Sequence, residues 1–118
     1  MDPEKVRNYC LKHEAADESF PFGENTLVFK VMGKMFCLMS MTPPWSINLK
    51  CDPEKAIELR ERNASVRPGY HMNKQHWNTI DLDGSIKEKV IEGWISDSYN
   101  LVVNSLPKKE RVKLRGIE

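Results

Sequence analysis

Residues 66–77 bring together the side-chain types that bind phosphate groups and stack on nucleic-acid bases. The stretch holds two of the three histidines, two cations and two large aromatic side chains around a Pro-Gly pair, and it follows no helical or strand pattern. Loops held by a rigid scaffold carry binding residues more often than core elements do. Aromatic side chains interleaved with cations are typical of surfaces that bind nucleic-acid strands. We therefore interpret residues 66–77 as a binding loop.

Cations close to this loop in the sequence extend the predicted surface. We expect five of them to contact phosphates and three neighbouring polar or aromatic side chains to lie near bases or sugars. Phosphate contacts supply affinity without reading the sequence, and they make binding strongly dependent on salt. The predicted partner is a nucleic acid, bound with little sequence preference. The expected phosphate contacts are Lys50, Arg60, Arg62, Arg67 and Lys74, and the expected base or sugar contacts are Tyr70, His71 and Asn73.

An architectural role explains the same residues. Arg60 and Arg62 would occupy the last turn of a helix, where cations are favourable against the helix dipole. Trp77 can anchor the following strand in the core while Arg67 and Lys74 are solvated. In this interpretation several residues brace the loop against the rest of the fold. The predicted anchors are Pro68, Gly69, His76, Trp77, Ser98 and Tyr99.

Two other function classes remain as alternatives. A protein-interaction or chaperone-like module, or a homodimer, would be favoured by exposure of Met39, Met41 and Trp45 at an open sheet edge. Enzymatic or metal chemistry could involve His71 and His76 with a nearby aspartate. The chain has no nucleophile elbow, no phosphate-binding glycine loop and no HExxH motif, so we expect no catalysis, no cofactor and no metal.

Composition is that of a soluble globular protein. The 118 residues are 40% hydrophobic and 30% charged, which fits one domain spanning residues 1–118. No apolar run approaches the length of a membrane-spanning helix, and the N-terminus does not resemble a signal peptide. Three widely spaced cysteines, Cys10, Cys37 and Cys51, are typical of free thiols in a reducing compartment. We expect a cytoplasmic protein that does not associate with membranes.

Positive charge is unevenly distributed although the net charge is only +1. Residues 30–77 hold eight cations and four anions, and residues 107–118 hold five and two. The remaining segments are acidic. Such a distribution permits a basic patch on a nearly neutral protein.

Hydrophobic periodicity and capping residues predict the elements that position the loop. Asp-Pro at 2–3 and at 52–53 predicts helix starts, with helices over 3–13 and 53–62. Ser85 and Glu88 have the spacing of a capping box before a long helix, and Pro107 precedes a short basic helix at 108–115. Strand patterns occupy 27–32 and 34–40 on either side of Gly33, then 46–51 and 77–82, with a short strand or turn at 66–70. In 46–51 the apolar residues are expected to face inward and Asn48 and Lys50 outward. The acidic residues 14–18 are expected to form a connector, and Phe20 and Phe22 after it are expected to fill the core.

This order of elements predicts an α+β fold in which helices pack on one face of a curved antiparallel sheet. The residues from Arg67 to Trp77, followed by Asp83-Gly84 and Ser98-Tyr99, resemble the signature of the MmcQ/YjbR family. The resemblance covers nearly the whole chain. It implies a frataxin-like (CyaY-like) fold, described as a double-wing DNA-binding arrangement, with no cofactor and no settled activity. Residues 42–45 depart from the family pattern.

Overall fold

The computed structural model of the chain describes residues 1–69 and 72–115. In these residues an N-terminal helix is followed by four strands, a helix, two further strands and two helices. Their bounds are α1 (Pro3–Leu11), β1 (Ala16–Ser19), β2 (Thr26–Val31), β3 (Lys34–Ser40), β4 (Ser46–Lys50), α2 (Pro53–Arg62), β5 (Val66–Pro68), β6 (Trp77–Asp81), α3 (Glu88–Ser105) and α4 (Lys108–Arg115). Within this part of the chain no helix combines the length and the hydropathy that crossing a membrane requires.

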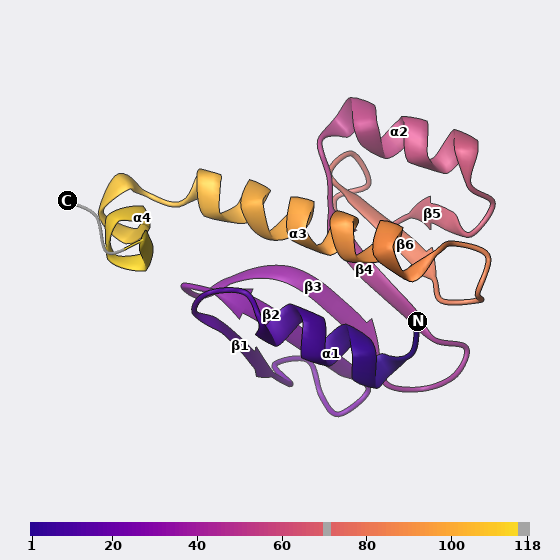
Figure 1. Ribbon diagram of the computed structural model, residues 1–118, viewed down its shortest axis with the longest axis horizontal. Helices are drawn as coiled ribbons and strands as arrows, with labels where there is room; N and C mark the ends of the chain where they lie inside the picture. Colours follow the sequence, from indigo (N-terminus) through magenta and orange to yellow (C-terminus); the bar gives the residue numbers. More distant parts are fainter. Residues whose placement is uncertain (70–71, 116–118) are drawn as a thin grey trace.

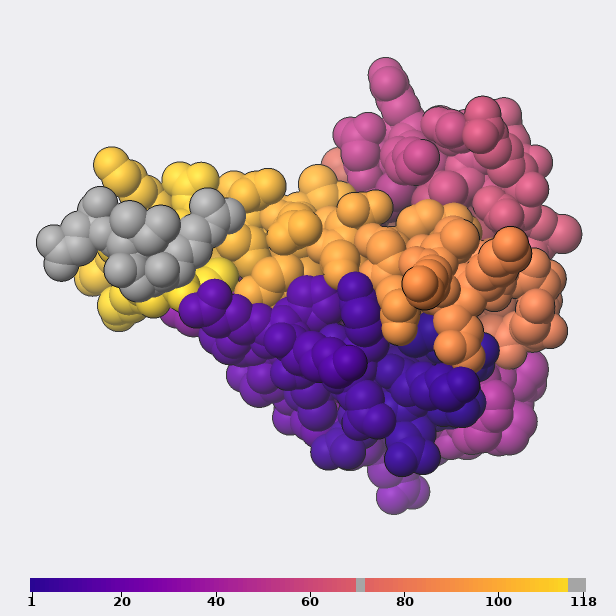
Figure 2. Space-filling view, in the orientation of Figure 1, coloured from indigo at the N-terminus to yellow at the C-terminus, as the bar shows by residue number. Residues whose placement is uncertain are grey.

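The strands form one open antiparallel sheet in the order β1-β2-β3-β4-β6-β5. The helices lie on one face of it, which is the face turned toward the viewer in Figures 1 and 2. Alternate strand residues point to this face and form the main hydrophobic core with side chains from all four helices. Its members include Phe29, Cys37, Ile47 and Ile80 from the sheet, and Val6, Leu59, Ile95 and Leu114 from the helices. The predicted α+β architecture is confirmed.

Local signals located several elements correctly. The side chain of Asp2 caps α1 by accepting a hydrogen bond of 2.9 Å from the backbone N–H of Lys5. Met32 and Gly33 both have positive φ, at 50° and 81°, in the turn between β2 and β3. Two such residues give the turn the twist that a two-residue hairpin needs. The predicted hairpin at Gly33 is therefore confirmed.

Three local predictions were wrong. Phe20 and Phe22 do not fill the core, because their exposed fractions are 48% and 66%. The acidic segment before them is not a connector, since residues 16–19 form strand β1 and pair with β2. Ser85 does not cap α3. That helix begins at Glu88, while the Ser85 hydroxyl donates to Asp83 within the preceding turn at 2.6 Å.

Helix α3 is joined to the sheet by one buried hydroxyl group. The Ser98 hydroxyl donates to the carbonyl of Phe36 at 2.6 Å and accepts from the N–H of Lys50 at 2.9 Å. The β2–β3 register shifts between Phe29 and Lys30, so Phe36 has no partner on β2. Ser98 thus bridges β3 and β4. Tyr99 donates to the carbonyl of Glu14 at 2.6 Å. Ser98, which was predicted to anchor the 66–77 loop, thus joins α3 to the sheet, and Tyr99 joins α3 to the segment that follows α1.

Candidate binding surface on the uncovered face of the sheet

No described helix covers the second face of the sheet. A row of cross-strand neighbours runs over it from β2 to β5. Neighbouring residues in antiparallel strands share a face, so these side chains lie side by side. A hollow of about 520 Å³ opens on this face. The row is Val28, Leu38, Asn48, Thr79 and Arg67, and the hollow is lined by Phe22, Thr26, Leu38, Ser40, Ser46, Asn48, Arg67, Met72 and Thr79.

The floor of the hollow is polar and ordered. Thr79 donates its hydroxyl hydrogen to the amide oxygen of Asn48 at 2.7 Å, which fixes the orientation of that amide. The NH₂ group of Asn48 donates to no group within the described part of the chain. Ser46 and Thr26 add hydroxyl groups that can donate or accept. The floor therefore offers directed hydrogen-bond donors to a bound molecule.

Arg67 brings a charged group to the edge of the hollow. Its guanidinium group forms a two-pronged pair with Asp81, with 2.9 Å between Nε and Oδ2 and 2.7 Å between Nη2 and Oδ1. The pairing holds the planar guanidinium in one orientation and balances its charge. The hollow is therefore close to electrically neutral at this point.

Apolar side chains form the rest of the wall. Phe22 stands in the β1–β2 connection and is the most exposed of the large hydrophobic side chains described. Leu38 belongs to the floor, and Met72 comes from the loop before β6. Trp77 is buried on the same face, where it packs with Val28 and Leu38. An apolar wall beside a hydrogen-bonding floor is typical of sites for small or planar ligands.

Gly69 brings the loop backbone close to this floor. A Cβ atom at Gly69 would lie 3.0 Å from the Cβ of Trp77 and 3.2 Å from the amide oxygen of Asn48. The N–H of Gly69 also donates to the carbonyl of Trp77 at 2.9 Å. A side chain at position 69 would therefore be too close to its neighbours, which explains why glycine follows Pro68.

The predicted phosphate contacts do not form one surface. Arg60 points inward from α2 and donates to the amide oxygen of Asn78 at 2.8 Å, and Asn78 is 1% exposed. Arg62 pairs with Glu58 one turn earlier at 3.4 Å. Both arginines lie on the helical side of the sheet, whereas Lys50 and Arg67 belong to the uncovered side. Their separation follows from α2 packing against β5 and β6.

The loop between β5 and β6 is held mainly through its backbone. Asn73 accepts from the N–H groups of His76 and Trp77 at its carbonyl, and its side chain accepts from the N–H of Gln75. The carbonyl of His76 accepts from Cys51 at 2.7 Å, and that of Lys74 accepts from Arg60 at 3.4 Å. The predicted contacts Tyr70 and His71 lie outside the described residues.

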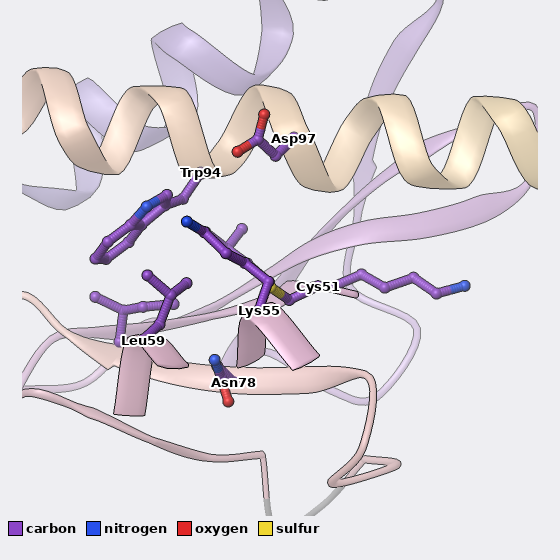
Figure 3. Close-up of a pocket in the computed structure, with 9 residues that line it drawn as sticks. Cys51, Lys55, Leu59, Asn78, Trp94 and Asp97 are labelled. Atoms are coloured by element: carbon purple, nitrogen blue, oxygen red, sulfur yellow. The ribbon is translucent and has the colours of Figure 1, made fainter. Parts of the chain in front are cut away.

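A second cavity lies between α2 and α3. Figure 3 shows Lys55 and Leu59 reaching it from α2, and Trp94 and Asp97 from α3, beside Cys51 at the end of β4. Its volume is about 20 Å³, which suffices for one water molecule. Burial, followed by the nearby carboxylates of Asp52 and Asp97, raises the pKa of the Cys51 thiol. This cavity is too small for a ligand.

Two other expectations concern metals and exposed apolar groups. Among residues 1–69 and 72–115, no three His, Cys, Asp or Glu side chains form a group that could hold a metal ion. Met39 is buried at 1% exposure, and Met41 and Trp45 are half-buried. The exposure that would favour a protein-interaction surface is therefore not found at these three residues.

Comparison with known proteins places the chain in a family. The model of the YjbR family matches residues 11–101. The chain belongs to the YjbR family. It is 37% identical over 113 residues to the uncharacterised protein YbdF of Escherichia coli O157:H7, covering 95% of this chain and 93% of that one. It is 32% identical over 112 residues to uncharacterised YjbR of Escherichia coli K12, covering 94% and 95%.

Solved structures of similar sequence share the fold. The crystal structure of Deinococcus radiodurans protein DR2400, with its DUF419 domain, superposes with a TM-score of 0.89 at 38% identity, covering 98% of this chain and 88% of that one. A protein from Pseudomonas syringae superposes with a TM-score of 0.76 at 28% identity, covering 86% and 98%. The YjbR-family resemblance inferred from the 67–77 motif is thus confirmed.

Sequence reasoning missed most of the residues that line the hollow. Asn48 was assigned to an outward strand face, but Thr79, Ser46, Thr26 and Phe22 were not singled out for binding. The available signal was the period-two pattern in residues 46–50 and 77–81, which places these polar residues on one face. That pattern does not show which outward residues become neighbours, because the pairing of β4 with β6 spans some thirty residues.

Proposed function

We propose that this YjbR-family chain is a non-catalytic nucleic-acid-binding protein whose contact surface is the uncovered face of the sheet. The observation that carries the proposal is the 520 Å³ hollow, whose lining includes Arg67, Asn48 and the exposed ring of Phe22. Arginine, amide and hydroxyl groups contact phosphates, sugars and base edges, and aromatic rings stack on bases. The surface differs from the one predicted from sequence because Arg60 and Arg62 are not part of it.

Further cations lie outside the hollow, with Lys50 on the same face and those of α4 on the helical side, where they act only at longer range. Lys50 occupies the uncovered face two residues after Asn48. Lys108, Lys109 and Lys113 of α4 are exposed and form no ion pair within the described residues. Leu114 of the same helix packs into the main core, so this basic helix is attached to the domain. Clustered cations of this kind raise the rate at which nucleic acids associate.

The lining of the hollow supports binding rather than catalysis. Its side chains are hydroxyl, amide, thioether and hydrocarbon groups, together with Arg67. Acid-base catalysis usually employs His, Asp, Glu, Lys, Tyr or Cys within reach of the substrate. Asp81 lies next to the hollow, but its carboxylate is already engaged by Arg67.

The proposal is tested by measuring fluorescence anisotropy of labelled single-stranded and duplex DNA at low salt. The double variant Lys50→Glu with Arg67→Gln removes three units of positive charge from the sheet face. We expect its affinity to fall about tenfold or more, because each lost phosphate contact also loses its counterion release. Affinity of the unmodified protein should fall steeply as salt rises.

A matched control changes charge on the helical side. Lys55→Gln with Arg62→Glu alters the net charge by the same amount on α2, and its affinity should remain within about twofold. Melting temperatures establish that both variants fold. Equal losses in the two variants would show that only net charge matters, and the absence of DNA binding by the unmodified protein would refute the proposal.

A further inference from the structure

The hollow has room for one planar heterocycle and the polar and apolar groups to bind it. We infer that it seats a single unpaired base of a bound strand, so that the protein prefers single strands to duplexes. The inference rests on the proposed function and adds to it the form of nucleic acid that is bound. It depends on three properties of the hollow, namely its volume, its directed polar floor and its apolar wall.

Volume separates this site from the other cavity. At about 520 Å³ the hollow lies within the range of roughly 300–1,000 Å³ typical of sites for small ligands, whereas the cavity at Cys51 holds about 20 Å³. A base within a duplex is stacked on both sides and paired along its edge. A concave site on the face of a sheet can hold a base only after that base has left the stack.

The floor presents groups that suit the edge of a base. The Asn48 NH₂ group is directed by the 2.7 Å hydrogen bond that its oxygen accepts from Thr79. It can donate to a ring nitrogen or a carbonyl oxygen of a base. The hydroxyl groups of Ser46 and Thr26 rotate and can donate or accept, so they adapt to different bases. This combination predicts little preference among the four bases.

The wall presents groups that suit the face of a base. Phe22 is 66% exposed although it is aromatic, and burial of its ring against a base would remove that apolar surface from water. Leu38 and Met72 supply apolar contacts at the floor and at the loop. The exposure of Phe22, which is unfavourable in the free protein, is thus explained by stacking in the complex.

Strand β4 also provides a contact for the phosphate next to the seated base. Lys50 follows Asn48 by two residues on the same face of β4, which places it about 7 Å further along the strand. A phosphate attached to the seated nucleotide would lie within reach of this ammonium group. The site for the base and the contact for the phosphate therefore lie in succession along strand β4.

The test compares three labelled ligands of equal length: an oligothymidylate, an abasic strand with the same phosphates, and a duplex. We expect the oligothymidylate to bind about tenfold tighter than the abasic strand, since stacking of one base contributes on the order of a factor of ten. We also expect it to bind tighter than the duplex. Thymidine monophosphate, used as a competitor, should bind much more weakly than the strand.

Variants assign the effect to the hollow. Ser46→Phe fills it and should reduce oligothymidylate affinity to that of the abasic strand, while abasic binding stays unchanged. Asn48→Leu removes the hydrogen-bond donor and keeps a side chain of similar volume. If Ser46→Phe does not fold, Asn48→Leu should likewise reduce the affinity for oligothymidylate and leave that for the abasic strand unchanged. Ser105→Phe adds the same ring on an exposed part of α3 and should change nothing.

The outcomes distinguish this inference from the proposed function. Equal affinity for the abasic strand and oligothymidylate, or for the duplex and oligothymidylate, would overturn the inference while leaving nucleic-acid binding intact. Binding of thymidine monophosphate as tightly as the strand would assign the hollow to a free nucleotide instead. Failure of every strand to bind would refute the proposed function and the inference with it.

Discussion

Thr79 on β6 donates its hydroxyl hydrogen to the amide oxygen of Asn48 on β4, with 2.7 Å between the two oxygens. The two residues are direct neighbours in the antiparallel pairing of their strands. This contact holds the centre of the uncovered sheet face in one arrangement, and it belongs to the hollow to which we assign ligand binding.

Thr79→Val removes that hydroxyl while keeping a β-branched side chain suited to a strand. We expect the free energy of unfolding to fall by about 1 kcal/mol, measured by urea denaturation, because one hydrogen bond is lost. Thr26→Val is the control, since the Thr26 hydroxyl on β2 has no hydrogen-bond partner among the described residues. Equal losses in the two variants would show that the Thr79 bond contributes nothing of its own.

Ser98→Ala should destabilise the fold more strongly. The substitution leaves the carbonyl of Phe36 and the N–H of Lys50 without the hydroxyl that joins them. An unsatisfied buried polar group costs about 1–3 kcal/mol, so the urea midpoint should shift clearly downward. Ser105→Ala on the same helix removes a hydroxyl that bonds only to Val102 one turn away, and it should be nearly neutral. A neutral Ser98→Ala would contradict the bridging role.

The cysteine thiols should differ in reactivity. Cys10 and Cys37 are buried, and burial together with the neighbouring Cys10 raises the pKa of the Cys37 thiol. Since the thiolate is the reactive species, neither should react with a disulfide reagent in the folded protein at neutral pH. Half-buried Cys51 should react slowly, and Cys51→Ser should abolish that signal. All three should react in denaturant, and rapid titration of three thiols in the native state would contradict the burial.

Stability should fall in acid through the pair formed by Arg7 and Glu18. The guanidinium group of Arg7 approaches the Glu18 carboxylate to 2.7 Å and lowers its pKa below the ordinary 4.5. A depressed folded-state pKa contributes stability above the unfolded value, and this contribution is lost as pH falls through the folded value. The pair is partly exposed, so solvent screens its attraction and its contribution to stability should be small.

Melting temperatures of Glu18→Gln and of the unmodified protein test this expectation. The variant should melt lower near neutral pH, and the difference should shrink below about pH 4 as the carboxylate becomes protonated. Glu24→Gln is the control, because it changes an exposed carboxylate that forms no ion pair among the described residues. A gap for Glu18→Gln that persists in acid would assign the effect to packing rather than charge.

The helices and the first hairpin could be predicted because their signals are local. The Asp2-Pro3 cap and the Gly33 turn act on groups within four residues of themselves. The same local reasoning failed for the capping box at Ser85, where the side chain bonds to Asp83 instead. It also failed for Phe22, because an apolar residue type does not show whether the chain carries it into the core.

The candidate site could be predicted only in part. Lys50, Arg67 and outward-facing Asn48 were identified from residue type and alternation. The grouping of Arg60 and Arg62 with them was not supported, because nearness in sequence to the loop does not determine on which side of the sheet a helix packs. Arg60 instead donates to buried Asn78.

The sequence by itself determined where α1 and α2 begin, where the first hairpin turns, and which residues of β4 face inward, because these depend on capping, backbone freedom and side-chain alternation. Only the tertiary structure decided that β4 pairs with β6 and that α2 packs with Arg60 and Arg62 on the side of the sheet opposite Arg67. These arrangements arise from long-range burial of apolar surface, which no short segment specifies. They leave the opposite face uncovered and bring Asn48, Thr79 and Arg67 together there.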